Sequence, residues 1–393
     1  MKNPIFWLPV LCLLLPGASH ARSRDSLGHG RISFVSVPLV IGGAAMSFCD
    51  RDFRELRNGY AANFRHDYDD YLQYAPLALT YGLKACGVQS RSSWGRMVVS
   101  NAFAASLMAA TVNTLKYTVR AERPDGSTRN SFPSGHAATA FMAATIFHKE
   151  YGRRSPWFSM AGYTIATATG IARLLNNRHW MSDVAVGAGI GIFTAELGYL
   201  LADLIYRERG LFEVGSSDIP DCYRGLSFLS LHVGVTTAIG SYTSFGGHRV
   251  RFAGGPAVGV RGAWFATPHV GIGGRLTVGN MRMTIDGEAQ PEAQYHASAA
   301  AGLYFAVPLT ARCAIGSQLL GGYEHYRRLR SSWGDLGARG GASIGTGLSM
   351  TFVAATNFGV RFSADYDLVS PVLRDSGEWL HRLTVGIEVC TLF

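Results

Sequence analysis

The C-terminal half of the chain alternates apolar and polar residues over long stretches, a pattern that few folds can accommodate. In residues 228–240, one set of alternate positions is apolar: Leu229, Leu231, Val233, Val235 and Ile239. The positions between them are small or polar: Ser230, His232, Gly234, Thr236 and Gly240. The same period recurs in 269–279, 357–366 and 382–393. Because successive side chains of a strand point to opposite faces, this period predicts β-strands, each with one apolar and one polar face.

The polar face of these strands limits the choice of β fold, because it carries charged residues such as Arg275, Arg361 and Glu388. An apolar face opposed by polar and charged residues fits an antiparallel barrel that has lipid outside and a polar lumen. Alternating runs between turn signals predict about eight strands over residues 224–393, which resembles small outer-membrane barrels, as does the terminal Phe393. A soluble β-sandwich that buries the same apolar face is the alternative.

Residues 33–208 are expected to form a separate all-α domain. Long apolar segments rich in alanine run over 97–119, 134–152, 158–175 and 183–206. Their small residues allow close helix packing. The same small residues make the segments only marginally hydrophobic as membrane spans, and Glu196 and Asp203 lie inside the last one.

Residues 1–21 are expected to be a signal peptide, with Lys2 at the start, the apolar run "IFWLPVLCLLL", and small residues at Ser19 and Ala21. An uncleaved anchor is the alternative. Cleavage leaves an odd, scattered set of cysteines without a disulfide framework: Cys49, Cys86, Cys222, Cys313 and Cys390. No Cys/His spacing resembles a metal site. The formal net charge of +9 favours anionic partners such as phosphates or lipid head groups.

Three polar motifs interrupt the helical half. Lys116 and Arg123 are seven residues apart, about two helical turns, so both can point the same way. The segment Pro133–His136, "PSGH", stands at an expected helix start, where the free N–H groups of Ser134 and Gly135 make an anion cradle. In the third motif, Arg173, His179 and Asp183 follow one another, and a spacing of four lets the carboxylate of Asp183 reach the imidazole of His179 on a helix.

In this order, the three motifs resemble those of the type 2 phosphatidic acid phosphatase (PAP2) and vanadium haloperoxidase superfamily. It includes lipid phosphate phosphatases and secreted bacterial acid phosphatases. The resemblance implies a PAP2-like helical bundle and a metal-independent phosphatase that requires no cofactor. Two positions depart from the family pattern. Ala172 stands where a serine is usual, which removes one hydrogen-bond donor, and the loop Pro124–Pro133 is short, which favours an open site.

The resemblance also implies a role for each motif residue. His179 is the expected nucleophile, which forms a phosphohistidine, and His136 is the expected general acid and later base. Asp183 is expected to hold the imidazole of His179 in the right tautomer. The expected phosphate ligands are three cations and two backbone amides: Lys116, Arg123, Arg173, Ser134 and Gly135.

The expected substrates are phosphate monoesters, above all lipid phosphates such as lipid A, phosphatidate, phosphatidylglycerol phosphate or isoprenyl pyrophosphate. The expected location is the outer membrane with the phosphatase domain in the periplasm, or alternatively the inner membrane with a soluble β domain. A non-specific periplasmic acid phosphatase, a vanadate-dependent haloperoxidase, and a porin-like or adhesive protein with a degenerate enzyme domain are further alternatives. No nucleic-acid partner is expected, and the sequence does not set the oligomeric state.

Some polar residues receive no chemical role from the sequence. The isolated histidines are expected to be structural or at the surface: His29, His66, His148 and His232. The segment "RHDYDDYLQY", residues 65–74, is expected to be a polar helix face without chemistry.

Overall fold

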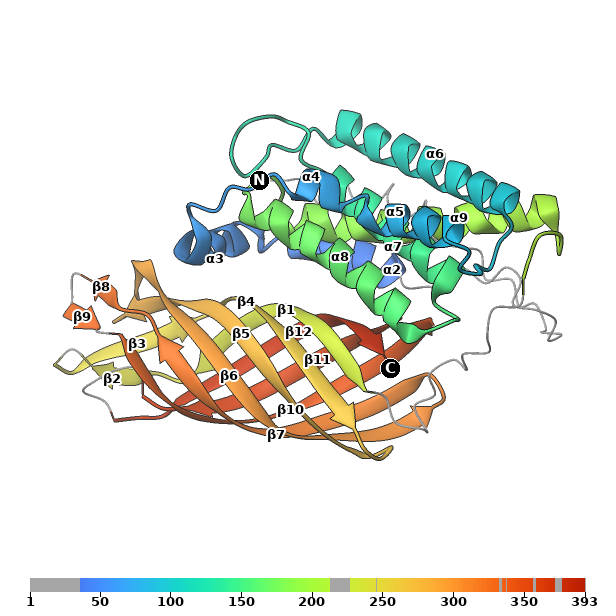
Figure 1. Ribbon diagram of the computed structural model, residues 1–393. Coiled ribbons are helices and arrows are strands. Elements are labelled where there is room, and N and C mark those ends of the chain that lie inside the picture. The colour runs from blue at the N-terminus through green and yellow to red at the C-terminus, as the bar shows by residue number, and fades with distance from the viewer. Residues whose placement is uncertain are drawn as a thin grey trace. The chain divides into compact units, whose positions relative to one another are not determined.

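The computed structural model describes residues 36–212, 227–244, 246–331, 334–336, 338–355, 358–371 and 377–392. The chain divides into two compact units, Met1–Ser217 and Asp218–Phe393. Figure 1 shows helices in the first unit and strands in the second. The predicted order of an all-α part followed by an all-β part is confirmed. The predicted signal peptide, His29, Cys222 and Phe393 lie outside the described residues.

The first unit is helical throughout its described part. Its elements are α2 (Ser36–Met46), α3 (Asp50–Ala61), α4 (Asp69–Leu72), α5 (Ala75–Ala85), α6 (Trp94–Val119), α7 (Gly135–Tyr151), α8 (Pro156–Leu175) and α9 (Met181–Tyr206). The four long apolar segments predicted from the sequence correspond to α6, α7, α8 and α9.

Glycines on α9 bring the backbone of α7 unusually close. A Cβ at Gly191 would lie 2.2 Å from the carbonyl oxygen of Ala138, and a Cβ at Gly187 would lie 2.5 Å from that of Ser134. No side chain fits in so little space, so only glycine permits this contact. As a result, the start of α7 is held directly against the first turns of α9. His136 of the second motif and Asp183 of the third lie on these two helix ends.

Two helices in the described part of the chain, α6 and α9, are long and apolar enough to cross a membrane by length and composition. Most of the apolar window of α9 is buried within the unit, whereas most of that of α6 is not. Helix α9 packs against α2, α6 and α7. Its apolar side chains are therefore part of the hydrophobic core of the unit.

The second unit is a closed antiparallel barrel. Its sheet has ten strands, of which β2 (Tyr242–Ser244) and β3 (His248–Ala253) extend one end of β5. The remaining eight form the ring: β1 (Phe228–Ile239), β4 (Gly255–Phe265), β5 (Val270–Ile285), β6 (Glu288–Thr310), β7 (Cys313–Tyr326), β10 (Arg339–Ala355), β11 (Phe358–Val369) and β12 (Leu380–Leu392). A short hairpin of β8 (Leu329–Ser331) and β9 (Gly334–Leu336) stands apart. Pairing of β1 with β12 along their length closes the ring, which confirms the prediction of about eight strands.

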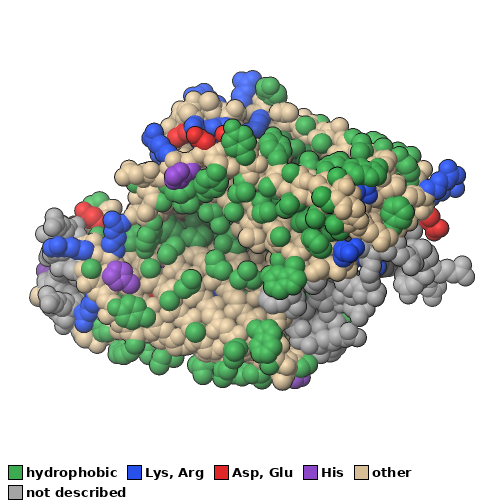
Figure 2. All heavy atoms as spheres, viewed as in Figure 1, with side chains coloured by type: hydrophobic (Ala, Val, Ile, Leu, Met, Phe, Trp, Pro, Cys, Tyr) green, Lys and Arg blue, Asp and Glu red, His purple; other side chains and the backbone are tan. Residues whose placement is uncertain are grey.

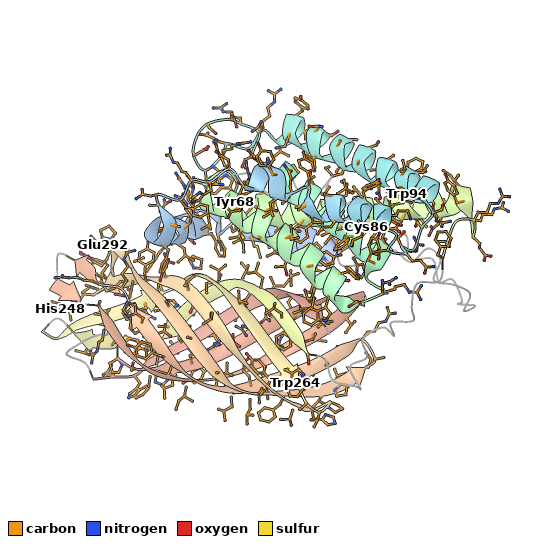
Figure 3. All side chains as sticks on the ribbon, viewed as in Figure 1. Tyr68, Cys86, Trp94, His248, Trp264 and Glu292 are labelled. Carbon is orange, nitrogen blue, oxygen red and sulfur yellow. The ribbon has the colours of Figure 1, made fainter. Side chains whose placement is uncertain are left out.

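The ring has its polar residues inside and its apolar residues outside. Arg261, Asp365 and Glu388 are almost completely buried, whereas Leu348 on β10 is 67% exposed and Trp264 on β4 is 59% exposed. Trp264 projects from the outside of the barrel (Figure 3). Hydrophobic side chains are spread over the face of the barrel that is turned to the viewer in Figure 2. The β-sandwich alternative is therefore wrong, because the apolar face of the strands is exposed rather than buried.

Ion pairs between the strands fill the lumen. Arg382 bonds Glu324 at 2.5 Å and Asp367 at 3.1 Å, while Arg261 bonds Asp365 and lies 3.2 Å from Glu388. A buried charge is tolerated only when it is paired in this way. The alternating polar face of the sequence thus lines the interior of this unit, which also holds two clusters of buried hydrophobic side chains.

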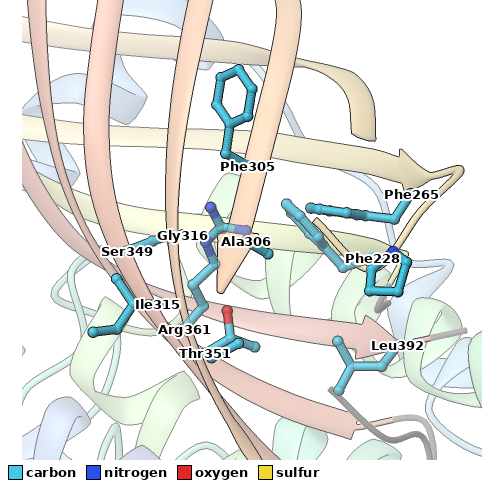
Figure 4. A pocket seen from close by; sticks show the side chains of 12 residues that line it. Phe228, Phe265, Phe305, Ala306, Ile315, Gly316, Ser349, Thr351, Arg361 and Leu392 are labelled. Atoms are coloured by element: carbon cyan, nitrogen blue, oxygen red, sulfur yellow. The ribbon is translucent and has the colours of Figure 1, made fainter. Parts of the chain in front are cut away.

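Aromatic residues close the lumen near the ends of β1 and β12. The guanidinium of Arg361 lies 4.4 Å from the ring centroid of Phe228, and both residues are labelled in Figure 4. The same guanidinium lies 5.8 Å from the ring centroid of Tyr304. The cavity at this point measures about 30 Å³, enough for about one or two water molecules. The lumen is therefore packed with side chains here.

Candidate functional site

The motif residues lie at the ends of helices in the first unit. Lys116 is in the last turn of α6, His136 in the first turn of α7, Arg173 in the last turn of α8 and Asp183 in the first turn of α9. His179 lies in the link between α8 and α9. Helix ends that meet in this way bring together residues that are far apart in the sequence.

Lys116 and Arg123 of the first motif were expected to point the same way from one helix, but the structure brings them together through another residue. Helix α6 ends at Val119, so Lys116 and Arg123 do not share a helix face, and that expectation is wrong. Asn130 joins them instead. Its carbonyl oxygen accepts from Lys116 Nζ at 2.6 Å, and its Oδ1 accepts from Arg123 Nε at 3.1 Å. Sequence reasoning missed Asn130, because a loop asparagine carries no signal of its own.

The imidazole of His179 is buried and held by a backbone carbonyl. Its Nδ1 lies 2.9 Å from the carbonyl oxygen of Ser131. A carbonyl oxygen only accepts, so Nδ1 carries the proton and Nε2 keeps its lone pair. Burial lowers the pKa of His179 to about 4, with a further lowering from the charges of Arg173 and Lys116 against a rise from Asp183. The ring is therefore neutral at pH 7, the state that a nucleophile requires.

Asp183 lies beside this ring without bonding it directly. Its Oδ2 is 3.7 Å from Nδ1 of His179, which is beyond hydrogen-bond distance. The same Oδ2 accepts from the backbone N–H of Trp180 at 2.9 Å and from the hydroxyl of Ser131. Because α9 begins at Met181, His179 is not on the helix, so the expected helical setting is wrong, whereas the expected approach of the Asp183 carboxylate to the imidazole is confirmed. The carboxylate acts on the ring through its charge, and Ser131 is the residue that the sequence did not single out.

The start of α7 supplies fewer free amides than the sequence predicted. The N–H of Ser134 donates to the carbonyl oxygen of Asp183 at 3.0 Å, and its hydroxyl accepts from the N–H of Ala137 at 3.3 Å. Ser134 is therefore a cap that ties α7 to α9, and its amide is not available to an anion. The amides of Gly135 and His136 belong to the first helical turn, where no intrahelical acceptor exists. Amides at such a helix end have the geometry to bind an anion.

Arg173 has an unused donor at the centre of the site. Its Nη1 donates to Asp69 Oδ2 at 2.7 Å and lies 3.3 Å from Asp70 Oδ1. Its Nε is buried and has no partner among the residues that the structure describes. A buried guanidinium N–H that makes no bond is costly, so an oxygen ligand at this place would stabilise the site. Ala172 beside it is fully buried and contributes no donor.

The second histidine bonds a carboxylate. Nε2 of His136 lies 2.8 Å from Asp70 Oδ1. Burial lowers the pKa of His136, as does the charge of Arg173, while Asp70 and Asp69 raise it. Residues 65–74 were expected to have no chemistry, and the structure corrects that expectation by placing two of their carboxylates on Arg173 and His136.

The cationic side of the site opens into a pocket of about 700 Å³. It is lined by the end of α6 and the following loop: Asn113, Lys116, Tyr117, Arg120, Glu122, Thr128, Arg129 and Asn130. Burial lowers the pKa of Lys116 to about 8, together with the charges of Arg123 and Arg173. Like charges that crowd in this way favour a bound anion.

The chain was compared with known proteins. Residues 95–207 match the family model described as the PAP2 superfamily. Over 174 residues, 44% of this chain, it is 49% identical to the lipid A 1-phosphatase of Porphyromonas gingivalis, and the match spans 39% of that protein's length. Among solved structures, LpxE of Aquifex aeolicus is 22% identical, with 38% of this chain and 94% of that chain covered and a TM-score of 0.30. Neisserial surface protein A is 9% identical, with 43% and 97% covered and a TM-score of 0.31.

The three motifs all lie inside the matched range, and the structure gathers them at adjoining helix ends. Residues 95–207 of this chain form a domain of the PAP2 superfamily.

Proposed function

We propose that this protein is a phosphatase that hydrolyses phosphate monoesters, using only its own side chains, through a phosphohistidine at His179. One observation carries the proposal. The neutral imidazole has its lone pair on Nε2, fixed by the bond from Nδ1 to Ser131, and it is close enough to the buried guanidinium of Arg173 to feel its charge. A neutral nucleophile close to a guanidinium that can bind a phosphoryl oxygen is the arrangement that phosphoryl transfer needs.

In the first step, Nε2 of His179 attacks phosphorus, the N–P bond forms and the bond to the ester oxygen breaks. Arg173, Arg123 and Lys116 offset the charge on the phosphoryl oxygens, and an arginine fork can bind two of them together. His136 gives its proton to the departing alkoxide. The charge of Asp183 stabilises the positive ring that carries the phosphoryl group.

In the second step, a water molecule gives a proton to His136 and its oxygen attacks the phosphorus. The N–P bond breaks, inorganic phosphate leaves and the imidazole of His179 becomes neutral again. His136 therefore returns to its acid form at the end of each cycle, as every catalyst must.

We further propose that the substrate is a phosphorylated lipid and that the barrel anchors the enzyme in the outer membrane with the helical unit in the periplasm. A ring with exposed apolar side chains and a polar, ion-paired interior has the surface of a transmembrane barrel. The relative of 49% identity is a lipid A 1-phosphatase. An anchored enzyme reaches a lipid without the lipid leaving the membrane.

The test uses the full-length protein in detergent micelles that contain one candidate lipid at a time, with EDTA present. The proposal predicts release of inorganic phosphate, and mass spectrometry of enzyme quenched during turnover should find the phosphoryl group on His179. A His179→Asn variant of equal thermal stability should release none. Activity that EDTA abolishes, or phosphate release by the variant, would overturn the mechanism. Fractionation of the cell envelope tests the location.

A further inference from the structure

We propose that Asp70 is a positioning residue that orients His136 by accepting from its Nε2, so that Nδ1 rather than Nε2 transfers the proton. This inference rests on the proposed phosphatase function and concerns the same site. One carboxylate oxygen contacts both His136 and Arg173. Asp70 Oδ1 lies 2.8 Å from Nε2 of His136 and 3.3 Å from Nη1 of Arg173.

The two neighbouring carboxylates do different work. Asp69 is completely buried and accepts from Arg173 at 2.7 Å and from the side-chain amide of Asn176 at 3.1 Å. Its contacts are those of a structural partner for the guanidinium. The side chain of Asp70 is 53% exposed, yet it contacts the expected general acid. Of the two carboxylates, only Asp70 bonds His136.

The segment that carries Asp70 is fixed to the end of α8. The side chain of Asn176 accepts from the N–H of His66 at 2.9 Å and donates to the carbonyl oxygen of His66 at 2.6 Å. Gln73 donates to the carbonyl oxygen of Asp70 at 2.8 Å. The bonds of Asn176 tether the chain just before the one-turn helix α4 to the end of α8, and the bond of Gln73 closes the turn of α4 itself. A half-exposed carboxylate is usually mobile, but here its backbone is held against the helix that carries Arg173.

The bond sets which ring atom does the chemistry. An ionised carboxylate only accepts, so Nε2 of His136 carries a proton as long as Asp70 is charged. The proton that moves to the alkoxide, and later returns from water, is then the one on Nδ1. In the same way, carboxylates elsewhere fix the tautomer of a histidine whose other nitrogen is reactive.

Asp70 also affects the fraction of His136 that is in its protonated, acid form. The groups that face His136 are Arg173 on α8, which opposes its protonation, and Asp69 and Asp70 on α4, which favour it. Asp70→Asn removes one favourable charge and leaves the opposing burial and Arg173 in place. The pKa of His136 then falls, and the acid form is lost at a lower pH.

The experiment measures kcat and KM against pH for the full-length enzyme on an alkyl phosphate. With Asp70→Asn, the alkaline limb should move down by about one pH unit, kcat at pH 7 should fall about tenfold, and KM should change less than twofold. Asp70→Glu keeps the negative charge, so its alkaline limb should lie between those of Asp70→Asn and the wild type. Asp67→Asn is the matched control, because it removes a carboxylate from the same segment without a contact to His136, and its profile should equal that of the wild type.

A second substrate separates proton transfer from a folding defect. An aryl phosphate with an acidic leaving group needs less protonation, so Asp70→Asn should lose less activity on it than on the alkyl phosphate. Equal loss on both, an unchanged alkaline limb, or a lower KM at constant kcat would each overturn the inference. Those outcomes leave the proposed function intact. Absence of phosphate release by the wild-type enzyme would refute the function itself.

Discussion

Nδ1 of His179 donates its proton to the backbone carbonyl oxygen of Ser131 at 2.9 Å. The carbonyl, which no side-chain substitution removes, thus fixes the tautomer of the expected nucleophile. Asp183, at 3.7 Å, supplies negative charge rather than a hydrogen bond. Fixing the tautomer and supplying negative charge are often the work of one carboxylate. Here the carbonyl of Ser131 does the first and Asp183 does the second.

Asp183→Asn should reduce kcat without abolishing it. The amide keeps an oxygen that accepts from Trp180 and Ser131 but loses the charge that stabilises the phosphorylated ring. We expect a loss of about 10²-fold, which corresponds to about 2.7 kcal/mol of transition-state stabilisation. Steady-state kinetics in micelles measure it.

Ser131→Ala is the matched control for this variant. It removes the hydroxyl that donates to Asp183 and retains the carbonyl, so its kcat should fall by less than about tenfold. If Asp183→Asn were as inactive as His179→Asn, then Asp183 and not Ser131 would hold the tautomer.

The acid side of the pH profile should report His179. Burial holds its pKa at about 4. As the pH falls through that value, the ring gains a proton at Nε2 and the nucleophile is lost, so kcat/KM should fall about tenfold per pH unit below pH 4. Phosphate esters change charge near a pH of about 6, so the two ionisations are separable. An acid limb near the ordinary histidine value of about 6.5 would contradict a buried, neutral nucleophile.

Arg129 should affect binding of the substrate rather than the chemical step. It lines the pocket that shares Lys116 and Asn130 with the phosphate site, where the remainder of a large substrate has room. Arg129→Ala should raise KM for an anionic lipid phosphate by about tenfold and leave kcat within twofold. A small alkyl phosphate, which does not reach Arg129, should show no change. Equal effects on both substrates would assign Arg129 to the phosphate site.

The close contact of α7 with α9 gives a prediction about stability. Gly191→Ala places a Cβ 2.2 Å from the carbonyl oxygen of Ala138, so the helices must separate. We expect a loss of about 1–3 kcal/mol in the free energy of unfolding, seen as a lower midpoint in thermal unfolding followed by circular dichroism. Gly82→Ala on α5 is the control, because nothing lies within 4 Å of its Cβ. It should stabilise by about 0.4–1 kcal/mol. Equal midpoints for both variants would show that the helices tolerate the extra atom.

Much of this architecture could be predicted from local patterns. The period of two located the barrel strands, and the apolar segments located α6 to α9, because both patterns arise within a single element. The contacts of Asp69 and Asp70 could not be predicted in this way. Asp69 reaches Arg173 across a sequence separation of 104 residues, and an acidic pair in a polar segment resembles a solvated helix face. The amide of Ser134 was misjudged because its acceptor, the carbonyl of Asp183, depends on how α7 and α9 pack.

The outer face of the barrel provides the test of its membrane setting. Leu348 lies near the middle of β10 and is 67% exposed. If that face meets lipid, Leu348→Arg puts a charge into hydrocarbon and should cost about 2–4 kcal/mol in the free energy of unfolding from lipid vesicles. On a water-facing strand, the same change is within about 0.5 kcal/mol of neutral.

The control for Leu348→Arg is an arginine at an outward-facing position nearer the end of a strand, where the bilayer is more polar. Val270 stands at the start of β5 and also faces outward, with 41% exposure. Near the membrane interface, Val270→Arg should cost only about 0–1 kcal/mol. Heat-modifiable gel mobility reports folding of each variant, and urea titration gives the free energies. Equal small costs at both positions would show that the apolar face is not in lipid, and the barrel would then need another partner to cover it.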